Sequence, residues 1–273
     1  MKVSFPCREC GDEDEGASEE VLVELRNDSY YDLTCSKGHK TKAQLRLLKF
    51  ELLFDLGAMA LLDGYTREAV ASLAAALERF YEFYIEVIRL KHDISDEEFG
   101  KVWKFMSKQS ERQLGAFVFT YLLENKSLPV YFETFFNKVK VGKKELQRFR
   151  NDATHAGYIP THEEVVEYGE HALAFIFGVL KELKDTSSEF IERAIEKYAF
   201  APFGGSARPG VRVQVAWPSI INLSMPFPRR VIISSKTEEA AGIKYRHEEP
   251  FGSISFQEGL KYVGEQRGEK YYR

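Results

Sequence analysis

The sequence predicts a mainly α-helical protein with a small β-rich segment at its amino terminus and a short strand-rich appendage at its carboxy terminus. Between residues 41 and 199 the chain is rich in Leu, Ala, Phe, Glu and Lys, and apolar residues recur at intervals of three and four, as in amphipathic helices. After Pro202 the composition shifts toward Gly, Pro, Val, Ile and Ser. We therefore expect three units, at 1–42, 43–200 and 201–273.

The composition fits a folded globular chain that does not bind nucleic acid or membranes through its overall charge. Of its 273 residues 44% are hydrophobic, and the formal net charge is −4. Any contact with nucleic acid therefore has to come from a local basic patch. The first residues lack the apolar stretch of a signal peptide, and no window approaches the roughly 18 apolar residues of a membrane-spanning helix. We expect a cytoplasmic protein without a membrane partner.

The amino-terminal segment carries the pattern of a structural zinc site. Its two knuckles are Cys7-Arg8-Glu9-Cys10 and Cys35-Ser36-Lys37-Gly38-His39, and they contain all three cysteines of the chain. Three thiolates and one imidazole complete a tetrahedral zinc site and leave no open position for a catalytic water. We expect Cys7, Cys10, Cys35 and His39 to bind zinc. The alternative is three free thiols beside an ordinary surface histidine.

Between the knuckles the sequence predicts two short strands, at 21–25 and 30–34, joined by the turn-forming residues Asn27, Asp28 and Ser29. Two knuckles that flank short strands have the layout of a zinc ribbon.

The middle of the chain predicts a series of helices. The first runs over 43–62 and ends at Asp63-Gly64, and the second runs over 66–91 and packs antiparallel to it. Shorter helices follow at 96–108, behind a Ser95 cap, and at 111–124. The face that carries Phe99, Val102, Trp103 and Met106 is expected in the core.

Three further helices complete this region. One begins near Gly142 and runs to Arg150, a long one follows the capping box of Thr161 and Glu164 as far as Lys184, and the last covers 186–198.

The most chemically suggestive run is Arg150-Asn151-Asp152-Ala153-Thr154-His155. A guanidinium grips phosphate oxygens, and an imidazole exchanges protons near neutral pH, so the pair suits cleavage of a phosphodiester. On an ideal helix, however, residues five positions apart point about 140° away from each other. The two side chains meet if the helix unwinds after the motif, or if a second copy of the chain supplies the partner across a twofold axis.

A basic island precedes the motif. Lys140, Lys143, Lys144 and Arg148 are opposed by the single Glu145, and they suit a track for nucleic-acid phosphates. A second interpretation gives this whole segment no functional role. It is then a solvated helix end, where Arg150 pairs with a nearby acid and His155 contacts carbonyls at the end of the helix.

An arginine followed by a polar residue and later by a histidine, near a helix end in a helical region, resembles the HEPN ribonuclease motif, here over residues 64–185. The resemblance implies an HEPN-like antiparallel helical bundle that acts as a homodimer on RNA without a metal. Arg150, Asn151 and His155 would be catalytic, with Asp152 orienting the imidazole. Many members are toxins or defence nucleases, some paired with a nucleotidyltransferase antitoxin, and others only bind. A non-catalytic binding module therefore remains the alternative, and a zinc-dependent enzyme is disfavoured by the closed zinc site.

The carboxy-terminal region predicts strands at 211–217, 220–224 and 231–235, after a linker at Gly204-Gly205-Ser206. Its last ten residues mix charged and aromatic side chains and are expected to form a flexible end.

Overall fold

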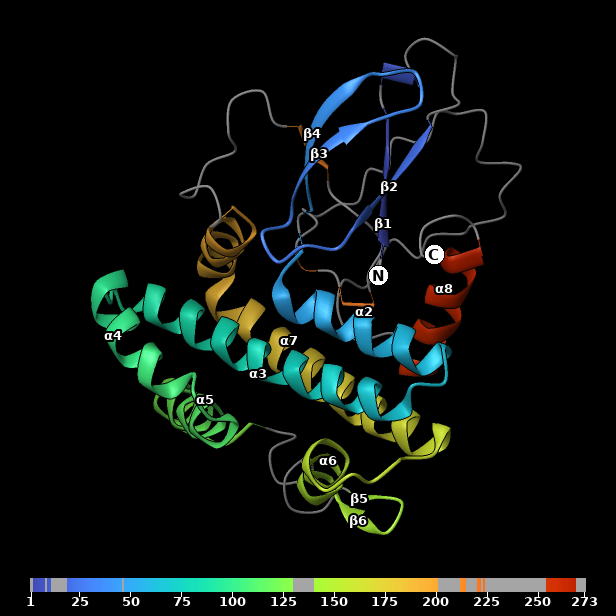
Figure 1. Cartoon of the computed structure of the whole chain (residues 1–273). Coiled ribbons are helices and arrows are strands. Elements are labelled where there is room, and N and C mark those ends of the chain that lie inside the picture. The colour runs from blue at the N-terminus through green and yellow to red at the C-terminus, as the bar shows by residue number, and fades with distance from the viewer. Residues whose placement is uncertain are drawn as a thin grey trace.

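The computed structural model describes residues 2–7, 9–10, 19–45, 47–129, 140–200, 212–214, 220–221, 223 and 254–268. Within these residues the chain is mainly helical, as predicted, with short strands above one side of the helical bundle (Figure 1). None of the described helices has both the length and the apolar composition that crossing a lipid bilayer requires.

The amino-terminal strands form two antiparallel hairpins. Strand β1 (Lys2–Pro6) pairs with β2 (Glu20–Glu24), and β3 (Tyr30–Thr34) pairs with β4 (Lys40–Leu45). The two strands predicted between the knuckles are thus present, but each pairs with a further strand that the sequence pattern had not revealed. The hairpins share a small core of their own, made of Val3, Phe5, Tyr31, Leu33, Ala43 and Leu45 together with Leu52 from the first helix.

The predicted start of the first helix is wrong by six residues. Residues 43–45 belong to β4, where Ala43 lies opposite Tyr31, and helix α2 spans Lys49–Leu62. The Glu51 side chain fixes this boundary, because its carboxylate accepts a hydrogen bond of 2.8 Å from the backbone N–H of Leu48. Pairing with the neighbouring strand β3 therefore overrides the helical spacing of the apolar residues here.

Helix α3 (Thr66–Lys91) is the centre of the bundle. It runs back along α2 after a turn at Gly64, which has a φ of 81°. A Cβ added to Gly57 of α2 would lie 2.7 Å from the Leu73 side chain of α3, so the glycine permits the close approach of these helices. The other large partner of α3 is α7 (His162–Phe200).

Helix α7 joins the last two predicted helices across a kink. The kink is at Ser187, which has φ −149° and ψ 29° and lies near the start of the second of these predicted helices, 186–198. The predicted capping box is confirmed at the start of α7, where the Thr161 N–H donates to Glu164 and the Glu164 N–H donates to the Thr161 hydroxyl at 2.9 and 3.2 Å.

Helices α4 (Asp96–Met106) and α5 (Ser110–Asn125) cover one end of α3. The Ser95 hydroxyl caps α4 by accepting a hydrogen bond of 3.2 Å from the Glu98 N–H. Phe117 anchors α5, with its ring stacked on Tyr81 at 5.0 Å. The prediction that the apolar face of α4 lies in the core is confirmed only in part, because Phe99 and Trp103 are partly buried and pack against the core whereas Val102 is exposed.

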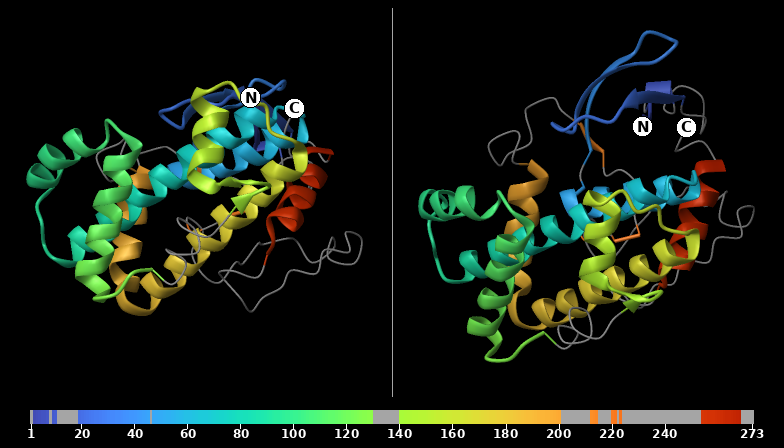
Figure 2. Two further views of the ribbon diagram at one scale, coloured as in Figure 1. Left: turned by 90° about the horizontal axis from the view of Figure 1, so that it is seen from below. Right: turned by 60° about the horizontal axis from the view of Figure 1, so that its bottom comes forward.

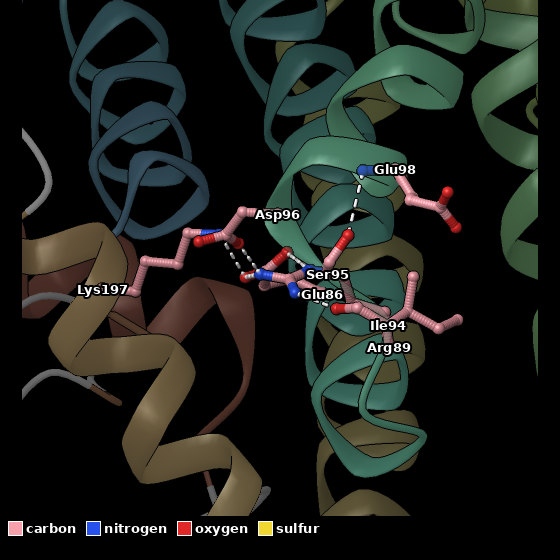
Figure 3. A network of polar contacts seen from close by, with 7 residues as sticks. All are labelled: Glu86, Arg89, Ile94, Ser95, Asp96, Glu98 and Lys197. Carbon is pink, nitrogen blue, oxygen red and sulfur yellow. Dashed lines mark hydrogen bonds and ion pairs between the residues drawn. The ribbon is translucent and has the colours of Figure 1, made fainter.

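A network of ion pairs around a buried carboxylate joins α3, α4 and α7 (Figure 3). Glu86, which is 0% exposed, binds the Arg89 guanidinium and the Lys197 ammonium, the latter at 2.8 Å. Asp96 at the start of α4 binds the same two cations. Arg89 also donates a hydrogen bond of 2.6 Å to the Ile94 carbonyl before α4. One buried carboxylate thus helps to set the positions of three helices.

The carboxy-terminal region contributes to both layers. Strand β7 (Arg212–Gln214) lies within the first predicted strand and pairs with β4 in parallel. Helix α8 (Phe256–Gly268), which the sequence had not predicted, packs on α2 and α7. The last ten residues were expected to form a flexible end, but the first five of them, up to residue 268, belong to α8. The Phe256 ring is fully buried over Gly169, where an added Cβ would come within 2.3 Å of it. The strand predicted at 231–235 lies outside the described residues.

The strand predicted at 220–224 is not present in the described residues of that stretch. Ile220, Ile221 and Leu223 are buried in the helical core instead, next to α2. Their backbone binds two buried carboxylates of α2, because the N–H of Ile220 donates to Asp55 at 3.1 Å and the N–H of Leu223 donates to Glu51. Burial raises the pKa of Asp55 well above its usual value.

Candidate functional site

The structure brings the four predicted metal ligands together. Cys7 and Cys10 follow β1, and Cys35 and His39 lie in the turn between β3 and β4, so both hairpins deliver ligands to the same place. The ligand atoms all lie within 4.8 Å of one another, and the three cysteines are buried and reduced. The Cys10 Sγ lies 3.7 Å from the Cys35 Sγ and 3.4 Å from the His39 Nδ1.

These distances fit a tetrahedral metal site. With a metal–sulfur bond of about 2.3 Å, the edge of a tetrahedron is about 3.7 Å. In the absence of a cation, burial and the neighbouring Cys7 and Cys35 thiols raise the pKa of Cys10 to about 12. A bound cation would favour the ionised form of this thiol, and the cluster has the donor set to bind one. The interpretation of separate free thiols does not fit this geometry.

The Arg150 to His155 motif lies on the side of the bundle opposite the amino-terminal hairpins (Figure 1). A short hairpin, β5 (Lys140–Val141) and β6 (Lys144–Glu145), turns at Gly142, whose φ is 60°. Helix α6 (Leu146–His155) follows at once. The prediction of a helix from Gly142 is therefore wrong, since the positive φ of that residue favours a turn. The predicted end of this helix at Arg150 is also too early, because α6 continues through the motif to His155.

Helix α6 stays regular to its end, so unwinding does not bring Arg150 and His155 together. Arg67 of α3 donates hydrogen bonds to the carbonyls of Ala153 and Thr154 at 2.8 and 3.2 Å. Gly157, with a φ of 75°, then ends the helix. Arg150 and His155 therefore keep the angular separation of an ideal helix within one chain.

Packing decides which way each side chain of α6 points. Leu146, Phe149 and Ala153 are buried against the bundle, which α6 contacts chiefly through α3 (Figure 2). Arg150 is half-buried beside this inner face, whereas His155 is exposed.

Arg150 lines a small pocket between α3, α5, α6 and α7. Glu78, Tyr81 and Tyr168 share this pocket, whose volume is about 30 Å³. Burial raises the pKa of both tyrosines, although the charge of Arg150 acts in the opposite direction. Among the described residues no acid forms an ion pair with Arg150. The interpretation in which the motif has no function requires such an ion pair, so this part of it is not met.

The exposed face of α6 carries Arg148, Asn151 and His155, which follow one another at intervals of three and four. This spacing places all three on one strip of the helix. Within the part of the chain that the structure describes, no side chain pairs with the His155 ring. Arg148 and His155 are seven residues apart, close to two helical turns, so they lie on the same side of α6. This spacing is visible in the sequence, but the sequence-based prediction paired His155 with Arg150 instead.

The basic island divides into two groups. Lys140, Lys143 and Arg148 are exposed. Lys144 is instead held by Asp152 at 2.9 Å, and its ammonium lies 3.3 Å from the centre of the Tyr158 ring. Asp152 thus pairs with Lys144 in place of the expected contact with the imidazole of His155.

No family model matches this chain, and no curated protein or solved structure is significantly similar to it. The resemblance to HEPN ribonucleases stays a prediction that rests on the motif and its helical setting.

Proposed function

We propose that this protein is a metal-independent endoribonuclease whose site is assembled from the α6 helices of two copies of the chain. The observation that carries the proposal is the arrangement of the Arg150 and His155 side chains. Arg150 and His155 both lack an ion-pair partner among the described residues, yet they point in directions that differ by about 140°. A twofold axis beside α6 would place the Arg150 of one copy opposite the His155 of the other.

The chemistry follows from these groups. The ribose 2′-hydroxyl attacks phosphorus, the bond from phosphorus to the 5′-oxygen breaks, and a cyclic phosphate remains. His155 accepts the proton of the 2′-hydroxyl or donates a proton to the leaving 5′-oxygen. Arg150 stabilises the negative charge that builds up on the phosphate oxygens, and Asn151, on the exposed face with His155, donates a hydrogen bond to phosphate.

The exposed cations of the basic island would hold the RNA. Lys140, Lys143 and Arg148 lie around α6 and its hairpin, and they bind phosphates without reading the base sequence. Lys144 would contribute less, because Asp152 already neutralises it.

A non-catalytic RNA-binding module of the same fold is the second candidate function. The observation that favours it is the position of Arg150, which is half-buried beside Tyr81 and Tyr168 in a pocket too small for a nucleotide. In this case the exposed strip of Arg148, Asn151 and His155 binds phosphate without cleaving it.

For the amino-terminal cluster we propose a structural zinc ion. Three thiolates and one imidazole, closely spaced and largely buried, are the ligands that zinc prefers, and they fill its four positions. The ion would join the two hairpins, which have only a small hydrophobic core of their own.

Cleavage of RNA in EDTA tests the proposed function. We expect the wild-type protein to cut single-stranded RNA and leave cyclic phosphate ends, and His155→Ala to lose at least about 100-fold in rate, the usual contribution of a general acid or base. His162→Ala is the matched control, because His162 is also exposed but lies at the start of α7. Salt-dependent binding by a folded wild-type protein that does not cut RNA would favour the binding module.

A further inference from the structure

A second group of cations lies on α4, outside the motif. Lys101, Lys104, Phe105 and Lys108 follow one another at intervals that place them on one side of α4 and the turn after it. Lys101 forms an exposed ion pair of 2.6 Å with Glu97. Among the described residues no acid pairs with Lys104 or Lys108, so two lysines on this surface are available for another anion.

An aromatic ring lies in the middle of these lysines. Phe105 is 55% exposed, although the core takes up most of the other aromatic side chains of the bundle. The guanidinium of Arg112, from the first turn of α5, lies 4.3 Å from the centre of the ring and donates a hydrogen bond of 3.4 Å to the Phe105 carbonyl. The arginine thus holds the ring at the surface and adds a third cation beside it.

This surface borders the candidate nuclease site. Ser110 and Leu114, at the start of α5, line the same small pocket as Gln147 and Arg150 of α6. Helices α5 and α6 both pack on α3 (Figure 2). The pocket lies between them, since residues of all three helices line it. The start of α5, which carries Arg112, therefore lies next to α6.

We propose that α4 and the first turn of α5 form a binding surface for single-stranded RNA, with a base stacked on Phe105 and with Lys104, Lys108 and Arg112 bound to phosphates. The proposal rests on the proposed function for its choice of RNA. Charge complementarity favours this partner, because an exposed ring among three cations combines the two features that bind single strands, a stacking platform and phosphate contacts. A duplex keeps the faces of its bases stacked inside, so it does not offer a base to the ring.

Binding of a 2′-O-methyl single-stranded RNA, measured by fluorescence anisotropy in EDTA, tests this surface without any cleavage. We expect Phe105→Ala to weaken binding about 5- to 100-fold, since stacking on one ring contributes that much. Phe105→Tyr keeps the platform and should bind like the wild type. The matched control is Leu123→Ala, because Leu123 is 66% exposed near the end of α5, away from these cations.

The phosphate contacts have a separate signature. The double variant Lys104→Ala, Lys108→Ala should lower the slope of log affinity against log salt concentration by about 1.4, at roughly 0.7 for each lost contact. Since all these side chains are exposed, their loss should leave the fold intact, which circular dichroism checks.

The possible results of these experiments distinguish a failure of the proposed binding surface from a failure of the proposed nuclease activity. If Phe105→Ala binds as tightly as Leu123→Ala, or if duplex RNA binds as well as the single strand, the proposed surface is overturned even if the wild type cuts RNA. If the variants weaken binding as expected but wild-type protein does not cut RNA with free 2′-hydroxyls, the surface stands and the nuclease proposal fails. If the wild-type protein binds no RNA, the proposed RNA-binding surface is overturned. A protein would then be the partner to test for the exposed apolar residues of this surface.

Discussion

Removing the metal should unfold the amino-terminal hairpins while the helical bundle remains folded. Structural zinc sites contribute about 10–16 kcal/mol of binding free energy to small domains. We expect the hairpins to depend on this energy, because their own core is small and the proposed ligands Cys7, Cys10, Cys35 and His39 come from both hairpins. The bundle has a separate and much larger core. We therefore expect Cys10→Ser to lose the zinc ion, and hydrogen exchange to show the loss of protection in β1–β4 but not in α3.

Zinc content per chain, measured by atomic absorption, gives the stoichiometry, for which we expect one ion. Ser36→Ala is the matched control, since Ser36 lies in the same turn as Cys35 and binds Glu19 at the surface. A protein that contains no zinc when purified without chelator, or hairpins that keep their protection in Cys10→Ser, would contradict the structural zinc site.

Glu86→Ala should lower the free energy of unfolding by about 3–5 kcal/mol, as expected when one partner of a buried ion pair is removed. The loss leaves the Arg89 guanidinium, which is 5% exposed, without its buried partner. Lys197 also loses a contact that holds α7 to α3. Urea denaturation measures the change.

An exposed ion pair provides the control for this effect. Glu97→Ala removes a partner of Lys101 on the surface of α4, where pairs of this kind contribute about 0.3–0.5 kcal/mol. Equal effects of Glu86→Ala and Glu97→Ala would show that burial of the Glu86 network does not matter to stability.

Local patterns predicted much of the fold and the metal ligands. Helices α3, α4 and α5 begin and end close to the predicted residues, and α7 begins as predicted. The caps at Ser95 and Thr161 are readable from the sequence because they act over one turn of chain. The four ligands were found for the same reason, since each knuckle has its own short spacing.

The elements that were missed depend on distant partners. Strand β4 pairs with β7, far away in the sequence, as well as with the neighbouring β3, and a helical spacing of apolar residues does not predict this pairing. Residues 220–223 fold against the carboxylates of Asp55 and Glu51, far away in the sequence. Helix α8 likewise depends on the space that Gly169 leaves for Phe256.

The candidate site was predictable in its residues but not in their directions. The sequence identified Arg150, Asn151 and His155 as a group, but packing of Leu146, Phe149 and Ala153 on the bundle decides which of them face solvent. Only the structure separates the half-buried Arg150 from the strip that carries His155.

The most direct test of the composite site is complementation between two inactive variants. Arg150→Ala and His155→Ala are co-expressed with different tags, and RNA cleavage in EDTA is measured for each variant alone and for the mixture. With random pairing about half of the dimers are mixed, and each of these holds one intact site of two, so we expect about a quarter of the wild-type rate. A mixture no more active than its separate parts, beside an active wild type, would contradict a site built from two copies of α6.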